Sequence, residues 1–257
     1  MWSRQLISLF GGATATCRLT ARTSDNVMKR HRSRAFAAGV LLYVSLIPAG
    51  WTESLTLDQQ IADLKNSNDG SPVEIKHSQP DFLAGAYYLE VEVLAPYHPR
   101  FSNYVFRADR GIYSADLIDN LNRLPTEFGI SIKDADMAMR FAQWRLRLTE
   151  GSAFWPISSP LEVPFISPEK MPMFAEAVQK AKTTIAGMVA PPAASTDHDG
   201  FTVTQYAVVG TTLVRYQAFI GQTAGWTCTK AILARDLPVI SVTPAKPPLG
   251  GACPQTN

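Results

Sequence analysis

Hydrophobic and polar residues alternate along three runs in the last third of the chain. The runs cover residues 201–209, 213–220 and 226–234, and short turns around Gly210 and Gly221 separate them. Alternation with a period of two is typical of β-strands that bury one face. Because consecutive strands joined by short turns pair antiparallel, we predict a three-stranded antiparallel meander here.

Apolar residues in the middle of the chain recur instead every three or four positions. The clearest example is the segment from Asp134 to Thr149. Its apolar stripe holds Met137, Phe141, Trp144 and Leu148, and its polar stripe holds Asp136, Arg140, Gln143 and Arg147. This pattern predicts an amphipathic helix that buries the Trp144 side and ends at Gly151.

Weaker patterns of the same kinds predict further helices and strands. We expect helices over 55–65, 114–124 and 172–189, and strands over 89–93 and 104–108. Thr56 is positioned to cap the first of these helices, and Pro125 should end the second. The stretch 191–200 is rich in turn-forming residues and is expected to be a linker or a long loop.

These elements favour an α+β fold for a single domain over residues 50–257. Helices come first and strands last, without the regular alternation of strand and helix that builds a parallel sheet. We expect an antiparallel sheet, including the C-terminal meander, to pack on the amphipathic helices. A sheet curved around the helix at 134–149 resembles the cone-shaped NTF2-like and cystatin-like folds, a resemblance of shape that implies nothing certain about function.

A basic run followed by an uncharged apolar run precedes this domain. Residues 28–34 are rich in Lys and Arg, and the thirteen residues from Ala35 to Ile47 carry no charge. A helix of that length spans about 20 Å, short of the roughly 30 Å hydrocarbon core of a bilayer. The pattern is typical of a signal peptide at residues 28–49, cleaved after Ala49. We therefore expect a periplasmic or secreted protein without a stable transmembrane anchor.

Residues 1–27 do not fit the usual plan of a signal peptide, which begins with its basic run. We interpret them as an extension of doubtful reality, with Met28 as the true start. The alternative is an organelle transit peptide, because residues 1–34 are rich in Arg, Ser and Thr and nearly free of acids. A bipartite signal would then carry the domain to an organelle lumen.

Composition supports a folded domain and argues against a nucleic-acid partner. Hydrophobic residues make up 46% of the 257-residue chain and charged residues 18%, which suits a globular core. The chain has 24 basic and 22 acidic residues. Seven of the basic residues and one of the acidic residues precede residue 50, so the predicted domain has 17 basic and 21 acidic residues. Such a mildly acidic domain lacks the surplus of Lys and Arg that neutralises phosphates.

Only two of the three cysteines, Cys228 and Cys253, follow the predicted signal peptide. Two remaining thiols in an exported protein usually pair, so we predict a disulfide that holds the Pro- and Gly-rich tail on the last strand. Closing this loop should contribute roughly 3 kcal/mol. The alternatives are two separate buried thiols or a metal site, for which no His lies at ligand spacing.

Catalytic and metal-binding motifs give little support to an enzyme. The stretch 195–200 partly matches a calcium loop, but Tyr206 stands where that loop needs a bidentate Glu. His77, His98 and His198 have no second ligand at zinc spacing. No phosphate-binding glycine motif and no nucleophile elbow occurs. We therefore expect neither a cofactor nor a metal.

The densest aromatic region of the domain supplies a candidate binding loop. The candidate binding loop consists of Tyr97, His98, Arg100 and Phe101. Exposed aromatic rings offer rigid area for recognising a ligand or a protein, whereas buried rings would simply fill the core. The same two interpretations apply to Trp155.

Glu90 and Glu92 are the nearest thing to a carboxylate pair in the sequence. They fall on the same face of the strand predicted at 89–93. They could act together on a ligand, but alternation along a solvated strand face explains them equally well, and we favour that explanation.

The sequence thus predicts an exported, non-enzymatic protein that binds another envelope or extracellular protein, or a small ligand. A secreted hydrolase that uses His98 or His198 is one alternative, and a structural subunit of an envelope complex is another. Polar groups within hydrogen-bond reach of these histidines in a closed pocket would favour the hydrolase. An exposed aromatic patch without such a cluster would favour binding.

Overall fold

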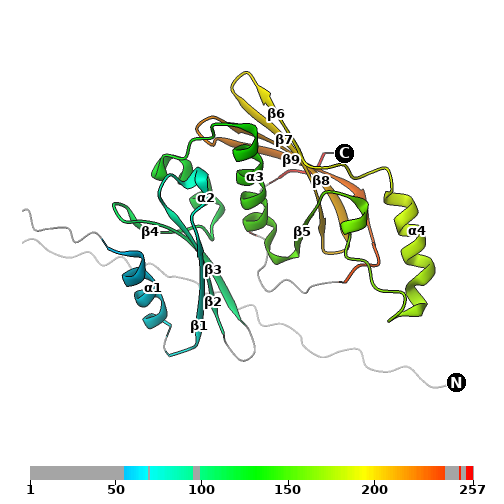
Figure 1. Cartoon of the computed structure of the whole chain (residues 1–257), viewed down its shortest axis with the longest axis horizontal. Helices are drawn as coiled ribbons and strands as arrows, with labels where there is room; N and C mark the ends of the chain where they lie inside the picture. Colours follow the sequence, from blue (N-terminus) through cyan, green and yellow to red (C-terminus); the bar gives the residue numbers. More distant parts are fainter. Residues whose placement is uncertain (1–54, 69, 95–98, 241–248, 250–252, 257) are drawn as a thin grey trace, which may run out of the picture. The chain divides into compact units, whose positions relative to one another are not determined.

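Two antiparallel sheets and four α-helices make up the part of the chain that the computed structural model describes (Figure 1). The described part covers residues 55–256 without residues 69, 95–98, 241–248 and 250–252. The predicted extension and signal peptide, residues 1–49, lie outside it. Within the described residues, no helix is both long and apolar enough to span a membrane. The predicted α+β class is confirmed, whereas neither the NTF2-like nor the cystatin-like fold is established.

The first sheet contains the strand order β1-β2-β3-β4, and each strand is antiparallel to its neighbours. The strands are β1 (Val73–Ser78), β2 (Tyr87–Val93), β3 (Arg100–Arg107) and β4 (Gly111–Ser114). Tyr88 and Val105 of one face belong to the main core. Leu89 and Val91 of the other face are buried as well, so both faces of this sheet bury apolar side chains.

Helix α1 (Leu57–Asn66) begins where the sequence predicted. The Thr56 hydroxyl accepts a hydrogen bond from the Gln59 backbone N–H, and the Gln59 side chain accepts one from the Thr56 backbone N–H at 2.7 Å. This reciprocal capping box satisfies two of the N–H groups that a helix leaves free at its start. Figure 1 shows α1 beside the first sheet, on the side away from α3.

The second sheet contains the predicted C-terminal meander and two further strands. Its members are β5 (Phe154–Ile157), β6 (Ala193–Asp197), β7 (Gly200–Val209), β8 (Thr212–Gly221) and β9 (Trp226–Ala234). Strands β7, β8 and β9 pair antiparallel in sequence order, which confirms the meander. Strands β5 and β6 both pair with β7, at opposite ends of it.

Strand β6 corrects the prediction of a linker or loop over 191–200. Residues Ala193–Asp197 pair with β7, and a tight turn at His198 and Asp199 joins the two strands. The side chains of β6 are small or polar and mostly exposed, so they show no hydrophobic period. The main-chain bonds to β7 hold this strand, and these contacts are not visible in its own composition.

Helix α3 (Ala135–Glu150) lies between the two sheets and contributes to the core of both. Asp134 caps it by accepting the Met137 N–H at 2.7 Å, and Gly151 follows its end in a positive-φ conformation. The predicted apolar stripe packs with Tyr88 and Val105 of the first sheet and with Phe201 and Val203 of the second. The stripe around Trp144 is therefore buried largely as predicted, and α3 joins the two sheets.

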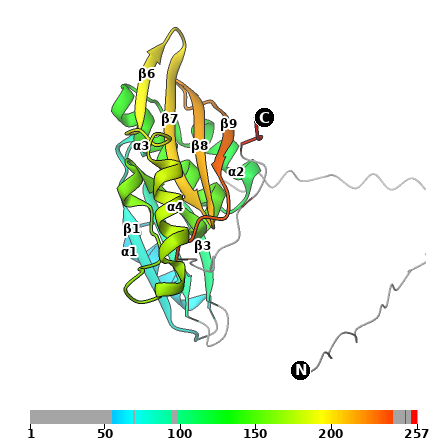
Figure 2. The same cartoon turned by 90° about the vertical axis from the view of Figure 1, so that its right-hand side faces the viewer.

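Helix α4 (Ala175–Ile185) covers the opposite face of the second sheet. Four short 3-10 helices also occur in the described chain, at Asp81–Leu83, Gly151–Ala153, Pro160–Glu162 and Pro172–Phe174. Ile185 packs with Val208, whereas the neighbouring Ala207 packs with Leu146 of α3. Successive residues of a strand point to opposite faces, so α3 and α4 enclose this sheet (Figures 1 and 2).

Helix α2 (Ile118–Phe128) corrects both predicted ends of the second helix. It begins after Leu117 rather than at Ser114, and it continues through Pro125. Proline has no N–H for the carbonyl four residues earlier, which belongs to Leu121. The buried Arg145 guanidinium of α3 donates to that carbonyl at 3.0 Å. A side chain from another helix thus replaces the bond that the proline removes.

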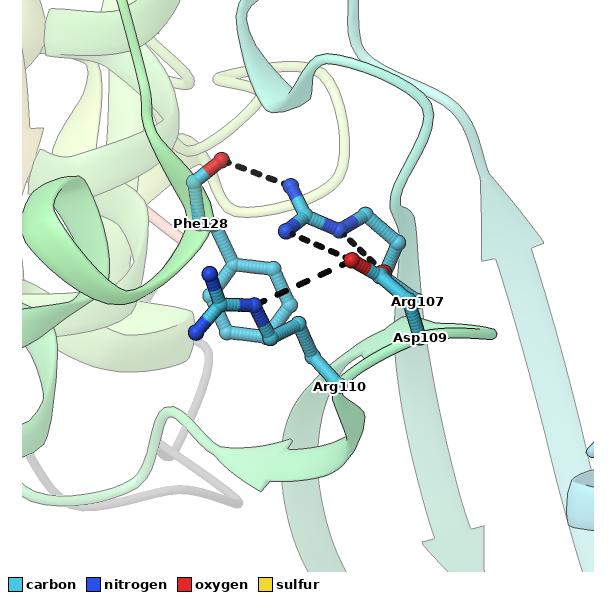
Figure 3. Close-up of polar contacts among 4 residues, drawn as sticks. All are labelled: Arg107, Asp109, Arg110 and Phe128. Carbon is cyan, nitrogen blue, oxygen red and sulfur yellow. Dashed lines mark hydrogen bonds and ion pairs between the residues drawn. The ribbon is translucent and has the colours of Figure 1, made fainter. Parts of the chain in front are cut away.

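The C-terminal end of α2 is held by an arginine at the end of strand β3 (Figure 3). The Arg107 Nη1 group donates to the Phe128 carbonyl at 2.8 Å, and its guanidinium carbon lies 5.5 Å from the centre of the Phe128 ring. Asp109 accepts from the same guanidinium at 2.6 Å. A cation at this position is favourable because the last carbonyls of a helix carry partial negative charge.

The predicted disulfide between Cys228 and Cys253 is present and joins β9 to the C-terminal tail. Beside it, the Lys230 N–H donates to the Pro254 carbonyl and the Thr256 N–H donates to the Lys230 carbonyl, both at 2.9 Å. The tail therefore pairs with the outer edge of β9 for a few residues. The crosslink and these bonds together hold it there.

Candidate binding groove

Two adjoining cavities lie where β1 and β2, helix α3 and strand β5 come together. Their volumes are about 690 Å³ and about 360 Å³. Residues that line both cavities are Lys76, Tyr88, Glu90, Arg147, Phe154 and Trp155. Because these residues are shared, the cavities form one continuous depression, named here the α3 groove. Each of the two volumes falls in the range of roughly 300–1,000 Å³ that is usual for ligand pockets.

The α3 groove is elongated. Along β1 its wall extends from Glu74 to Ser78, which is about 13 Å at roughly 3.3 Å per residue. Along α3 the wall extends from Arg140 to Gly151, which is about 16 Å at roughly 1.5 Å per residue. The two lengths agree, and they match about four or five residues of an extended polypeptide.

Charged side chains from β1, β2 and α3 line this groove. The strand register places Glu74 opposite Glu92 and Lys76 opposite Glu90, all on one face of the sheet. Arg147 reaches the groove from α3. Among the described residues, none of these five side chains takes part in a salt bridge. Their charges are available to a ligand, and the two facing carboxylates repel each other until a cation approaches.

One end of the groove carries an arginine that is already paired. Arg140 of α3 bonds Asp81 through two nitrogens, at 2.5 and 3.4 Å. These hydrogen bonds, with the charge of the guanidinium, lower the pKa of the Asp81 carboxyl. Because both side chains are about half exposed, the pair adds little to stability. It leaves Lys76 and Arg147 as the groove cations without an ionic partner among the described residues.

A hydrogen-bond network fixes the floor of the groove. The Tyr88 hydroxyl donates to Asn103 Oδ1 at 2.7 Å, and Asn103 Nδ2 donates to Asp116 Oδ1 at 3.0 Å. Burial, together with the negative charge of Glu90, raises the pKa of the Tyr88 hydroxyl. The hydroxyl therefore keeps its proton at neutral pH, and it also lies 3.4 Å from Glu90 Oε1. The network therefore holds the Tyr88 hydroxyl beside the Glu90 carboxylate.

Aromatic rings complete the groove. The Trp155 side chain, on β5, is 49% exposed, which is unusual for so large an apolar group. Phe101 of β3 is half-buried and lines the smaller cavity. Trp144, also half-buried, packs edge-on against Tyr88, with ring centres 5.7 Å apart. Exposed rings beside unpaired charges suit the recognition of an amphipathic ligand.

The predicted binding loop reaches this groove at one of its residues. Phe101 lines the smaller cavity, whereas Arg100 is exposed at the start of β3 and lines neither cavity. Tyr97 and His98 lie outside the described residues. A role for the loop as a whole stays a prediction.

Of the three histidines that follow the predicted signal peptide, the structure describes His77 and His198, which lie apart, whereas His98, named for the hydrolase alternative with His198, lies outside the described residues. His77 lines the larger cavity, and His198 lies in the exposed turn between β6 and β7. Neither imidazole ring is hydrogen-bonded to a described Ser, Asp or Glu side chain. The calcium-like stretch 195–200 forms this same hairpin, and no group of His, Cys, Asp and Glu among the described residues could hold a metal ion.

Several groove residues were not identified from the sequence. Glu90 and Glu92 share a face as predicted, and both are half-buried in the groove wall. Glu74, Lys76 and Arg147 were missed as groove residues, although alternation along Val73–Ser78 was a signal for the first two. Comparison of the chain with protein-family models, curated proteins and solved structures found no match.

Proposed function

We propose that residues 50–257 form an exported, non-enzymatic domain that binds an extended segment of another protein in the α3 groove. The observation that carries this proposal is the exposed Trp155 beside charged groove residues that have no ionic partner among the described residues. Trp and Arg are among the residue types that most often carry the binding energy of an interface, and Trp155 and Arg147 line both cavities. The elongated groove favours a polypeptide over a small round ligand.

Export is the part of this proposal that rests on the N-terminal sequence. The basic and apolar runs at residues 28–49 have the order of a signal peptide. The Cys228–Cys253 disulfide supports it, because disulfides persist chiefly in oxidising compartments. We propose the periplasm or the extracellular space as the location, with an organelle lumen as the alternative.

Binding is favoured over the hydrolase alternative by the chemistry of the groove. A hydrolase based on histidine needs that ring bonded to a nucleophile or to an orienting carboxylate. The described rings of His77 and His198 have no such bond, whereas the groove supplies aromatic area and charge. The partner is proposed to be an envelope or extracellular protein that presents an extended segment.

Trp155→Ala is expected to weaken binding at least tenfold. The test is selection of peptides from a random library by the purified full chain, followed by affinity measurement of the enriched peptides. Loss of a central aromatic anchor typically costs about 2 kcal/mol or more of binding free energy. Leu161→Ala is the matched control, because Leu161 is 94% exposed and lines neither cavity. The proposal fails if no peptide is enriched, or if both variants bind the enriched peptides equally.

A further inference from the structure

The free edge of strand β1 borders the α3 groove. In the described sheet β1 pairs only with β2. The consecutive residues Lys76, His77 and Ser78 all line the larger cavity. The His77 ring belongs to the opposite face of the sheet, where it lies 6.3 Å from the Tyr87 ring. Consecutive residues from both faces of the strand thus line this cavity, which places the edge of β1 at its border.

The hydrogen-bond register identifies the main-chain groups at this edge. The Leu94 N–H donates to the Pro72 carbonyl at 2.8 Å, directly before β1 begins. Bonded and non-bonded residue pairs alternate along an antiparallel ladder. Every second residue from Pro72 onward therefore bonds to β2, and the residues between them point their N–H and C=O groups away from it. These outward residues are Val73, Ile75 and His77.

We propose that the bound segment adds to the free edge of β1 as a fifth strand of the first sheet. This inference rests on the proposed function and specifies how the segment is held. Main-chain bonds to the outward groups of β1 supply affinity, and the groove side chains supply specificity. The added strand lies about 4.8 Å from β1, between β1 and the Trp155 side of the groove.

The charges of the groove define the segment that fits. On β1, the strand that an added segment would meet, Glu74 presents a carboxylate and Lys76 presents a cation two residues further along. Behind them on β2, Glu92 lies opposite Glu74 and Glu90 lies opposite Lys76, and Arg147 of α3 lines the same cavities. Side chains of an added strand repeat on one face with the same two-residue spacing. The segment therefore carries a basic side chain beside Glu74 and an acidic side chain beside Lys76. The peptide Lys-Val-Glu-Val-Lys has this spacing whether it binds parallel or antiparallel to β1, because its sequence is the same read from either end.

Binding of fluorescein-labelled Lys-Val-Glu-Val-Lys to the full chain, measured by fluorescence anisotropy, tests the inference. His77→Pro removes one outward N–H and places a ring at the free edge, while the β1–β2 bonds do not use that N–H. We expect His77→Pro to bind at least about tenfold more weakly than the wild type. The matched variant His77→Ala also removes the ring but keeps the N–H, so it should bind at least about threefold more tightly than His77→Pro.

Val73→Pro, with Val73→Ala as its control, repeats the test at the first residue of β1, where proline is well tolerated. The Val73 pair replaces the His77 pair as the test if His77→Pro fails to fold, which circular dichroism would show. Gln-Val-Gln-Val-Gln is the neutral probe and should bind at least about tenfold more weakly than the charged peptide.

The outcomes separate this inference from the proposed function. Equal binding by the proline and alanine variants overturns strand addition, while Trp155-dependent binding of library peptides would still support the groove. Equal binding of the neutral and charged peptides, or no binding of the charged peptide, overturns the assigned segment. If no library peptide depends on Trp155, the proposed function fails and the inference fails with it.

Discussion

Arg145→Ala is expected to lower the free energy of unfolding by about 3 kcal/mol. Arg145 is 1% exposed, donates to the Leu121 carbonyl and to the Asn122 side chain, and stacks 5.2 Å from the Trp226 ring. Burial lowers the pKa of its guanidinium to about 10. Removing the side chain leaves the carbonyl freed by Pro125 unsatisfied and opens a cavity between α2 and α3. Equilibrium denaturation measures the effect.

Arg147→Ala is the matched control for this prediction. Arg147 is two residues further along the same helix and exposed, so its loss should change stability by less than about 0.5 kcal/mol. A double-mutant cycle with Pro125→Ala tests the cause, because the new N–H at residue 125 can bond the Leu121 carbonyl. The combined variant should then lose about 1 kcal/mol less than the sum of the two single changes. Equal effects of Arg145→Ala and Arg147→Ala would contradict the role of Arg145.

Breaking the Cys228–Cys253 bond is expected to cost about 3 kcal/mol of stability. The bond closes a loop with a sequence separation of 25 residues, and it holds the tail beside Lys230. Opening it increases the conformational freedom of the unfolded chain and releases the tail from the edge of β9. Denaturation of the oxidised chain with and without reductant measures the difference.

The double variant Cys228→Ser with Cys253→Ser controls for other effects of the reductant. Its stability should equal that of the reduced wild type and should not change when reductant is added. A wild-type chain that is equally stable in both redox states would show that the crosslink contributes nothing.

Elements with a continuous apolar face were predictable from sequence, because their own residues carry the signal. Helix α3, expected over 134–149, spans Ala135–Glu150, and the meander strands β7 to β9 appear in the expected order. Strand β6 was not predictable in this way, since its exposed small residues are held by bonds to β7. Strand β1 does alternate at Val73 and Ile75, but it was overlooked.

The groove was harder to predict than the fold. It combines β1, β2, β3, α3 and β5, which are distant in sequence, and no local pattern states that they meet. The burial of Arg145 is a similar case. It belongs to neither of the two predicted stripes of α3, and its partner carbonyl is free only because a proline lies in another helix. Glu90 and Glu92 were identified as a pair, but their half-buried position depends on α3 and β5.

Amide hydrogen exchange of the full chain, with and without a saturating peptide from the library selection, tests the groove most directly. Binding in the α3 groove predicts slower exchange at Val73–Ser78 and Phe154–Ile157, the two strands whose edges border it. Slower exchange confined to another surface, such as the exposed residues 169–173, with β1 and β5 unchanged, would contradict it.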